Sequence, residues 1–274
     1  MCAAPGRHVR ATPFACTLLL LVVATLHAQQ AAAPFEPQVG QPGKDVVWVP
    51  SPEETVEKML DVAQVTPSDF VVDLGSGDGR NVIAAARRGA RALGVEYNPD
   101  MVALSRRNAA ATGVSGRAQF VEGDMFAADF SKATVLALFL LPSNMLQLRP
   151  KFLALAPGSR IVANTFGIEG WTPEVLLSIE HCTAWCTVML YVVPARVEGV
   201  WQTPQGTLTL TQAYQAVSGT LTSPGGELPV SGLLNGAAIT ITAGSWQMTG
   251  HVDGPRIDGT STVGGVSTTW AATR

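Results

Sequence analysis

The sequence predicts an α/β fold with a doubly wound, mostly parallel sheet and an antiparallel closing hairpin, followed by a small all-β barrel or sandwich domain. Between residues 45 and 195, short apolar stretches alternate with helix-like stretches, which is typical of a parallel sheet covered by helices on both faces. After Trp171 the pattern changes to strand, turn and strand. Residues 199–274 then alternate apolar and polar side chains between regular turn signals, as short antiparallel strands do.

The chain is long enough to bury a large core. Its 274 residues are 47% apolar and only 14% charged, which excludes a disordered chain. There are 18 basic and 21 acidic side chains, giving a net charge of −3. No overall field therefore draws the protein to a polyanion, and we expect no nucleic-acid partner.

Residues 1–28 have the pattern of a signal peptide. A basic segment over 7–10 precedes an apolar run over 14–26, and the small residue Ala28 provides a cleavage position. The apolar run is shorter than the roughly 20 residues that a membrane-spanning helix needs. We therefore expect an exported, periplasmic protein with no stable membrane span after cleavage. The alternative is an uncleaved leader that anchors it in the membrane. Residues 29–44 are expected to be a linker.

The domain expected over 45–195 begins with a helix. Ser51, Pro52 and Glu54 have the spacing of a capping box, which predicts a helix from there to about Gln64. The elements after it alternate in type, as a doubly wound sheet requires. They are expected as strand 70–74, helix 80–88, strand 91–95, helix 99–111, strands 118–121 and 134–139, helix 143–155, strand 160–164, and hairpin strands 175–180 and 187–193.

Residues 199–274 are expected to form the small antiparallel β domain. This segment holds 14 Thr and 13 Gly but only five charged side chains. Stretches such as 207–211 alternate Thr with Leu, the period of a half-buried strand. Trp201, Trp246 and Trp270 are interpreted as core or barrel-closing residues, and a ligand-binding mouth is the alternative.

A glycine-rich turn follows the first strand of the expected sheet. It reads Asp-Leu-Gly-Ser-Gly-Asp-Gly-Arg over 73–80. A nicotinamide-dinucleotide site would need a third glycine where Arg80 stands, and no Gly-Lys-Ser/Thr follows for a P-loop. Glycines let a ligand approach the backbone at the carboxyl end of the strand. Asp73 ahead of them favours a cationic ligand over a pyrophosphate.

Two further acids end the next two strands. Glu96 stands where, in a doubly wound sheet, an acid accepts hydrogen bonds from two ribose hydroxyls. Asp124 follows the third strand, where a carboxylate can accept from an exocyclic adenine amine. Each acid taken singly also fits a solvated strand end. Together with Asp73 and the glycine turn, they predict a site for a positively charged nucleoside.

Residues 47–193 resemble the class I S-adenosylmethionine-dependent methyltransferases. The string over 73–80 matches the first motif of that superfamily, 94–96 matches the second, and 123–124 matches the adenine-binding position. Shorter strings are similar to the ATP synthase c-subunit lysine methyltransferase family and its bacterial relatives, namely 48–52, 96–99 and 140–142. The resemblance implies a Rossmann-like fold and S-adenosyl-L-methionine as the cofactor, with no metal.

The resemblance also implies a role for each motif residue. Asp73, Gly75 and Gly77 would hold the methionine end of the cofactor, Glu96 its ribose and Asp124 its adenine. The expected cofactor-binding set is Asp73, Gly75, Ser76, Gly77, Glu96, Asp124 and Met125.

The methyl acceptor is expected beside residues 139–144, after the fourth strand, with Leu140, Pro142 and Ser143 as candidate catalytic residues. Many amine methyltransferases of the superfamily carry an Asn/Asp-Pro-Pro-aromatic string there, whereas this chain has one proline with no aromatic after it. The expected acceptor is a lysine side chain of a protein or another amine. A helix-entry turn is the alternative for 140–142. The alternative function is an exported, non-catalytic protein that binds an adenosyl ligand on a degenerate methyltransferase fold.

Two of the four cysteines lie in the expected leader, which leaves Cys182 and Cys186 in the mature chain. An oxidising compartment favours a disulfide between them. Two free buried thiols, or a metal bound with His181, are the alternatives.

Overall fold

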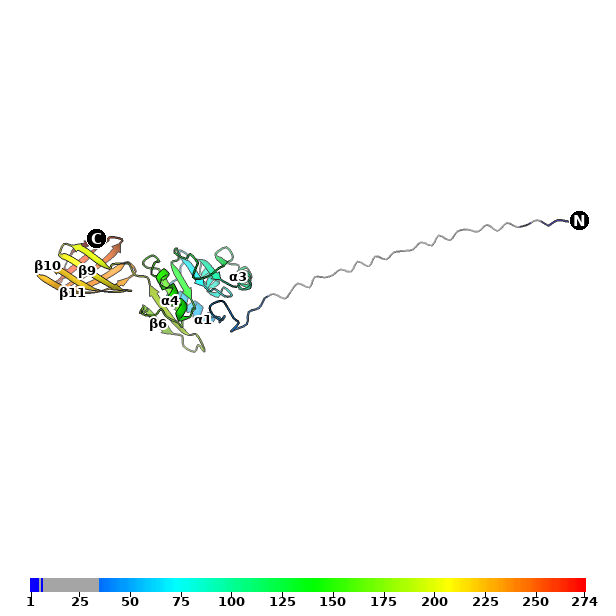
Figure 1. Cartoon of the computed structure of the whole chain (residues 1–274), viewed down its shortest axis with the longest axis horizontal. Helices are drawn as coiled ribbons and strands as arrows, with labels where there is room; N and C mark the ends of the chain where they lie inside the picture. The colour runs from blue at the N-terminus through cyan, green and yellow to red at the C-terminus, as the bar shows by residue number, and fades with distance from the viewer. Residues whose placement is uncertain (5, 7–34) are drawn as a thin grey trace. The chain divides into compact units, whose positions relative to one another are not determined.

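The computed structural model describes residues 1–4, 6 and 35–274 (Figure 1). The chain divides into two units, Met1–Pro34 and Phe35–Arg274, and the second contains both expected domains. Of the predicted signal peptide, residues 1–28, only residues 1–4 and 6 are described, so this prediction lies almost entirely outside the described residues. Among the residues that are described, no helix is both long and apolar enough to cross a membrane.

The first domain is built on a seven-stranded sheet in the order β3-β2-β1-β4-β5-β7-β6. Strands β1 to β5 run parallel, and β7 is antiparallel to both of its neighbours, so the predicted mostly parallel sheet with an antiparallel hairpin is confirmed. The strands are β1 Phe70–Leu74, β2 Arg91–Glu96, β3 Ala118–Glu122, β4 Val135–Leu138, β5 Arg160–Asn164, β6 Val175–Ser178 and β7 Thr187–Val192. The helices are α1 Glu53–Val62, α2 Arg80–Arg87, α3 Pro99–Ala111 and α4 Pro142–Phe152.

Helices pack on both faces of this sheet because neighbouring residues of each strand point to opposite sides. Val71 of β1 joins a core with buried residues of α1, α2 and α3. Val72 and Leu74 of the same strand join a second core with Met145 and Leu148 of α4. The doubly wound arrangement expected from the sequence thus follows from alternation within single strands.

The predicted capping box at the start of α1 is wrong. The N-cap is Pro52, and no side chain caps the helix. Ser51 is buried, and its Oγ accepts a hydrogen bond from Asn164 Nδ2 at 2.9 Å, so a partner distant in sequence has replaced the local one. At α3 the local rule holds, because Asn98 at the N-cap accepts from the Asp100 N–H and Pro99 opens the helix.

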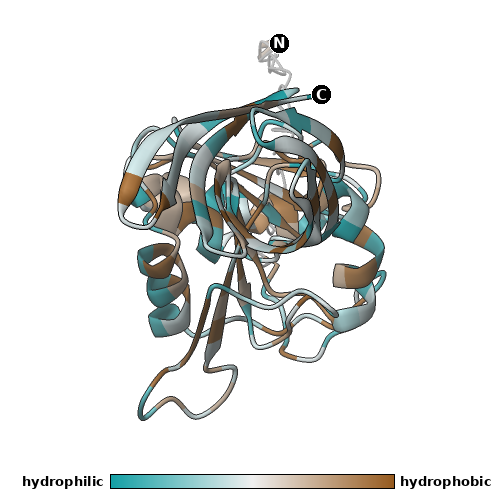
Figure 2. Cartoon of the chain, turned by 90° about the vertical axis from the view of Figure 1, so that its left-hand side faces the viewer, coloured by the Kyte–Doolittle hydropathy of each residue, from teal (hydrophilic) through white to brown (hydrophobic). Residues whose placement is uncertain are grey.

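The second domain is a closed antiparallel barrel in the order β10-β11-β12-β13-β14-β15-β8-β9. This confirms the barrel form of the predicted β domain. Apolar and polar residues alternate along its strands (Figure 2). The strands are β8 Gly199–Thr203, β9 Gly206–Ala213, β10 Ala216–Ser223, β11 Gly226–Asn235, β12 Ala238–Ala243, β13 Trp246–Asp253, β14 Arg256–Val263 and β15 Val266–Thr273.

Tryptophan fills the centre of the barrel. Trp201 and Trp270 are almost completely buried in its core, and Trp246 packs against that core while partly exposed. The Trp201 Nε1–H donates to the carbonyl oxygen of Val197 at 2.7 Å. The core interpretation of these tryptophans is therefore confirmed.

Two barrel turns contact the first domain. Tyr214, in the β9–β10 turn, stacks on Trp171 with ring centroids 5.2 Å apart, and its hydroxyl accepts from Arg149 Nη1 at 3.0 Å. In the β11–β12 turn, the carbonyl of Gly236 accepts from the Ala195 N–H at 2.8 Å. Ala195 is itself buried, so the short segment between the domains is packed rather than free.

Replacing Trp201 by Ala is expected to lower the free energy of unfolding by about 3–5 kcal/mol, because it leaves a large cavity in the barrel core. Val200, its exposed neighbour on β8, provides the control, since Val200→Ala should change stability by less than about 0.5 kcal/mol. Urea unfolding followed by tryptophan fluorescence and circular dichroism measures both. Equal stability of the two variants would contradict the assignment of Trp201 to the core.

Candidate active site

The glycine turn joins β1 to α2 by a backbone path that side chains would obstruct. Gly75, Gly77 and Gly79 have φ values of 72°, 55° and 85°. A Cβ on Gly77 would lie 2.7 Å from Trp48 Nε1, whereas a Cβ on Gly75 would meet only Leu140 Cδ2, at 3.6 Å. Because Gly75 also lines a cavity, its backbone is open to a ligand.

This cavity lies at the carboxyl ends of β1 to β4 and encloses about 220 Å³. Further lining comes from residues 41–49 before α1, from Asn98 and Met101 near the start of α3, from Phe166 after β5 and from Trp185 of the β6–β7 loop. Residues 41–44 belonged to the expected linker, yet here they form part of the wall. Its strand-end lining consists of Gly75, Val95, Glu96, Tyr97, Gly123, Asp124, Met125, Phe139, Leu140 and Leu141.

Glu96 ties the end of β2 to the glycine turn. Its Oε2 accepts from the Gly77 N–H at 2.9 Å, and its Oε1 accepts from the Asn98 N–H at 2.9 Å. Each carboxylate oxygen can accept more than one hydrogen bond. Glu96 is therefore held in place with acceptor capacity left for two neighbouring hydroxyls, as the ribose prediction requires.

Asp124 lines the same cavity and pairs with Lys44. The Lys44 ammonium lies 2.6 Å from Asp124 Oδ2 and 4.9 Å from the centroid of the Tyr97 ring. Phe126 N–H donates to Asp124 Oδ1 at 2.8 Å. The hydrogen bond from Lys44, followed by that from Phe126, lowers the pKa of Asp124, so it stays ionised. Lys44 was missed in the sequence because no motif marks it; only the fold brings it to Asp124.

Asp73 lies outside the lining of the cavity, in the buried layer next to the glycine turn. The residue is 3% exposed, and Asn81 Nδ2 donates to its Oδ2 at 3.0 Å. Burial raises the pKa of Asp73 well above its usual range, and nearby Glu96 and Asp78 raise it further, against the hydrogen bond from Asn81. Ser76 and Gly77 also lie outside the lining. In the described part of the chain the buried Ser76 Oγ has no hydrogen-bond partner.

The expected acceptor residues divide between the cavity and a helix. Leu140 lines the cavity, but Pro142 is the first residue of α4 and Ser143 is exposed beside it. Pro142 and Ser143 thus fit the helix-entry alternative. Three aromatic side chains, Phe139, Phe166 and Trp185, line the part of the cavity beyond β4, and the last two were missed because they follow β5 and β6, far along the chain.

The residues of the cavity fit an adenosyl ligand. Carboxylates at two adjacent strand ends face the same space as the backbone of Gly75, which has no side chain. In the residues that the structure describes, no group of three His, Cys, Asp or Glu side chains is arranged to hold a metal.

Comparison with known proteins agrees with this interpretation. A family model of the ANTKMT methyltransferase domain matches residues 73–175. A protein-lysine N-methyltransferase of Saccharolobus islandicus (strain REY15A) is 42% identical over 151 residues, which are 54% of this chain and 94% of that protein. The human lysine N-methyltransferase of the ATP synthase c-subunit is 36% identical over 50% of this chain and 59% of its own length.

A solved methyltransferase structure is also similar to this chain. The RNA methyltransferase from Salinibacter ruber, in complex with S-adenosyl-L-homocysteine, is 42% identical, with a TM-score of 0.51 over 54% of this chain and 96% of that one. Fold and cavity together define a class I S-adenosylmethionine-dependent methyltransferase. The chain belongs to the methyltransferase family that includes the S. islandicus enzyme, so the resemblance seen in its motifs is confirmed, and its cofactor is S-adenosyl-L-methionine.

Asp73→Asn is expected to stabilise the ligand-free protein at neutral pH and to weaken binding of S-adenosylhomocysteine about ten-fold. Above the ordinary pKa of Asp, about 3.9, the unfolded carboxyl ionises, whereas burial raises the pKa of folded Asp73 and favours its protonated form. The raised pKa therefore costs folding free energy as the pH rises, and Asn removes this cost. The ammonium group of the ligand, in contrast, favours the ionised form of the Asp73 carboxyl on binding, and Asn cannot provide that charge.

Urea unfolding at pH 4 and pH 7, with calorimetry of S-adenosylhomocysteine binding, measures both effects. Asp253→Asn, on an exposed residue of the barrel, is the matched control and should change neither. A less stable Asp73→Asn protein at pH 7 would show that the carboxyl is not held neutral.

Proposed function

We propose that this protein transfers a methyl group from S-adenosylmethionine to the side-chain amine of lysine in a protein. The observation that carries the proposal is the composition of the part of the cavity beyond β4, where we place the acceptor and which we call the acceptor wall. This wall holds no ionisable group and consists of Phe139, Leu140, Leu141, Phe166 and Trp185. An amine that packs against this apolar wall loses its bound water. This desolvation lowers the pKa of the ammonium group and favours the neutral amine. The S. islandicus and human relatives, both named as lysine N-methyltransferases, support the same acceptor.

The bound cofactor supplies a methyl group activated by its sulfonium. Gly75, Glu96 and Asp124 would hold that cofactor. Segment 41–49 and the aromatic residues Phe139, Phe166 and Trp185 would exclude water from it. Orientation and desolvation are the main demands of a displacement at an activated carbon. The wall lacks a strong base, so the proton of the acceptor ammonium is released to solvent before the amine attacks.

We also propose that the protein acts outside the cytoplasm. The leader pattern over residues 1–28 supports export. The disulfide between Cys182 and Cys186 supports an oxidising compartment independently.

Incubation of residues 29–274 with methyl-labelled S-adenosylmethionine and a periplasmic extract tests the reaction. The expected result is label in protein that survives nuclease and is lost on proteolysis, and peptide mass spectrometry should place it on lysine. Label lost on nuclease treatment would instead point to RNA, the acceptor class of the S. ruber methyltransferase.

Glu96→Ala should abolish transfer and weaken S-adenosylhomocysteine binding at least ten-fold, because two ribose hydrogen bonds are lost.

Calorimetry separates the alternative of a non-catalytic adenosyl-binding protein. Binding of S-adenosylhomocysteine without transfer to any protein would favour that alternative. Mass spectrometry of the exported protein tests the compartment, since its first residue should be Gln29, and a retained Met1 would contradict cleavage.

A further inference from the structure

The tip of the β6–β7 hairpin reaches the acceptor side of the cavity. Strand β6 ends at Ser178 and β7 begins at Thr187, and the loop between them carries Trp185 to the wall. Trp185 is 37% exposed. Its ring centroid lies 5.3 Å from that of Phe139, which follows β4, and 6.0 Å from that of Phe166, which follows β5. Three separate segments thus meet in one aromatic surface.

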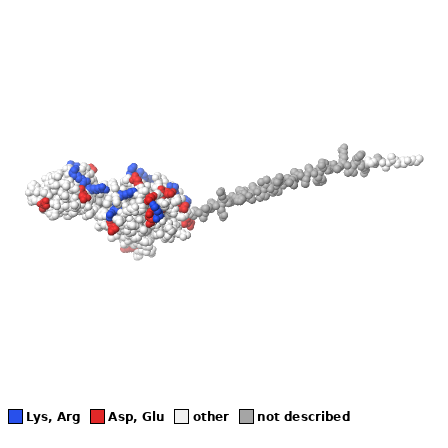
Figure 3. All heavy atoms as spheres, in the orientation of Figure 1, with Lys and Arg blue, Asp and Glu red and all other residues white. Residues whose placement is uncertain are grey.

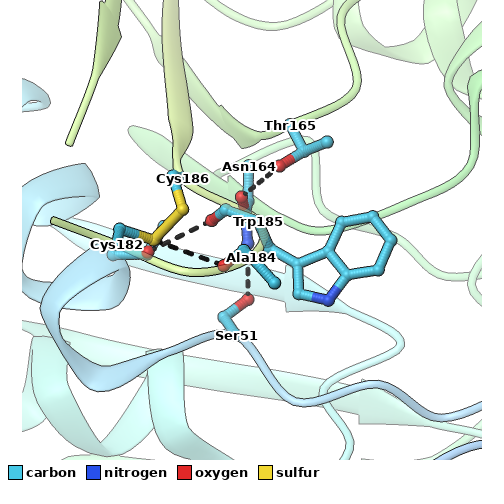
Figure 4. The surroundings of a disulfide bond; sticks show 8 residues. Ser51, Asn164, Thr165, Cys182, Ala184, Trp185 and Cys186 are labelled. Atoms are coloured by element: carbon cyan, nitrogen blue, oxygen red, sulfur yellow. Dashed lines mark hydrogen bonds between the residues drawn. A yellow bond between two sulfur atoms is a disulfide. The ribbon is translucent and has the colours of Figure 1, made fainter. Parts of the chain in front are cut away.

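A disulfide closes this loop. Cys182 and Cys186 are joined on either side of Trp185, with Cα atoms 5.7 Å apart (Figure 4). At the base of the loop the Ile179 N–H donates to the Cys186 carbonyl at 2.8 Å. The Trp185 carbonyl accepts from Thr55 Oγ1 of α1 at 3.2 Å, and Thr55 is fully buried. The backbone of Trp185 is therefore held from two sides.

This backbone has a conformation that the residue does not favour by itself. His181 and Trp185 both have φ near +60°, in the left-handed region. A residue other than glycine is strained there, and the conformation persists only where its surroundings impose it. The disulfide and the Thr55 hydrogen bond are the constraints that impose it here. Loss of the disulfide would remove one of these two constraints on Trp185.

The position of Trp185 separates it from cofactor binding. Gly75 follows β1, Glu96 ends β2 and Asp124 follows β3, and these residues form the cofactor side of the cavity. The three aromatic rings instead follow β4, β5 and β6. A change in Trp185 is thus expected to affect the acceptor and to spare the cofactor.

We propose that Trp185 is a specificity-determining wall for the apolar stem of the acceptor amine, and that the Cys182–Cys186 disulfide is the positioning element that holds it. This inference rests on the proposed function. Reduction by a dithiol, which gives up two electrons and two protons and becomes a cyclic disulfide, yields two cysteine thiols and frees the loop. Acceptor binding therefore depends on an oxidised protein.

The test uses n-butylamine, which has the four-carbon stem of lysine, as the acceptor with S-adenosylmethionine. The variants are Trp185→Ala, Trp185→Phe and the double variant Cys182→Ser/Cys186→Ser. Leu176→Ala is the matched control, because Leu176 is an exposed apolar residue of the same hairpin outside the cavity. Mass spectrometry follows methylated amine, calorimetry follows S-adenosylhomocysteine, and hydrogen exchange follows the Ile179 amide.

Trp185→Ala and the double serine variant should raise KM for n-butylamine about five-fold, with kcat changed less than two-fold, the size of effect expected from losing aromatic contact. Trp185→Phe should restore KM to within two-fold of the wild type. Dithiothreitol should make the wild type resemble the double serine variant and leave that variant unchanged. The dissociation constant for S-adenosylhomocysteine should stay within two-fold throughout, and Ile179 should exchange faster only where the disulfide is absent.

An unchanged KM in both Trp185→Ala and the double serine variant would overturn the inference and leave the proposed function standing. Unaltered exchange at Ile179 after loss of the disulfide would also overturn it. A wild-type protein that binds S-adenosylhomocysteine but methylates neither n-butylamine nor protein would remove the proposed function and this inference together. Weaker cofactor binding in Trp185→Ala would place the ring on the cofactor side instead.

Discussion

The hydrogen bond from the Gly77 N–H to Glu96 Oε2 is the contact on which the site depends. It joins the turn after β1 to the end of β2, so two neighbouring parallel strands present their polar groups at one edge. The turn fits only because Gly77 lacks a side chain, since a Cβ would meet Trp48. Trp48 belongs to the segment that covers the cavity, and this single close approach therefore couples the turn, the strand end and the cover.

The same edge holds a carboxyl whose ionisation is unfavourable. Asp73 is buried beside Asn81 with a raised pKa, and Glu96 and Asp78 add repulsion nearby. Such an arrangement lowers stability in the free protein, because the carboxyl cannot ionise without loss of solvation. A positively charged ligand would make ionisation of the Asp73 carboxyl less unfavourable. The site is thus organised for a cation at some cost to the empty protein.

The stretch of chain between β5 and β6 lines the cavity, contacts the barrel and leads into the disulfide-closed hairpin. Between β5 and β6 this stretch contributes Phe166 to the aromatic wall and Trp171 to the stack with Tyr214 of the barrel. On the face seen in Figure 3, acidic and basic side chains are interspersed and much of the surface carries neither. At the contact with the barrel, the aromatic stack of Trp171 on Tyr214 is joined by the hydrogen bond from Arg149 to the Tyr214 hydroxyl.

Local pattern in the sequence determined the strands, most helix limits, the glycine turn and the acids at the strand ends. These features depend on side-chain period, backbone freedom and the rule that parallel strands end at a common edge. Tertiary structure alone decided that Ser51 bonds to Asn164 and leaves α1 uncapped, that Lys44 pairs with Asp124, and that Trp185 reaches Phe139. These partners are separated by tens of residues. A local sequence pattern does not show which distant side chains will come together when the chain packs. The cofactor edge could therefore be predicted from the chain, while the cover and the acceptor wall were decided by how distant segments close around it.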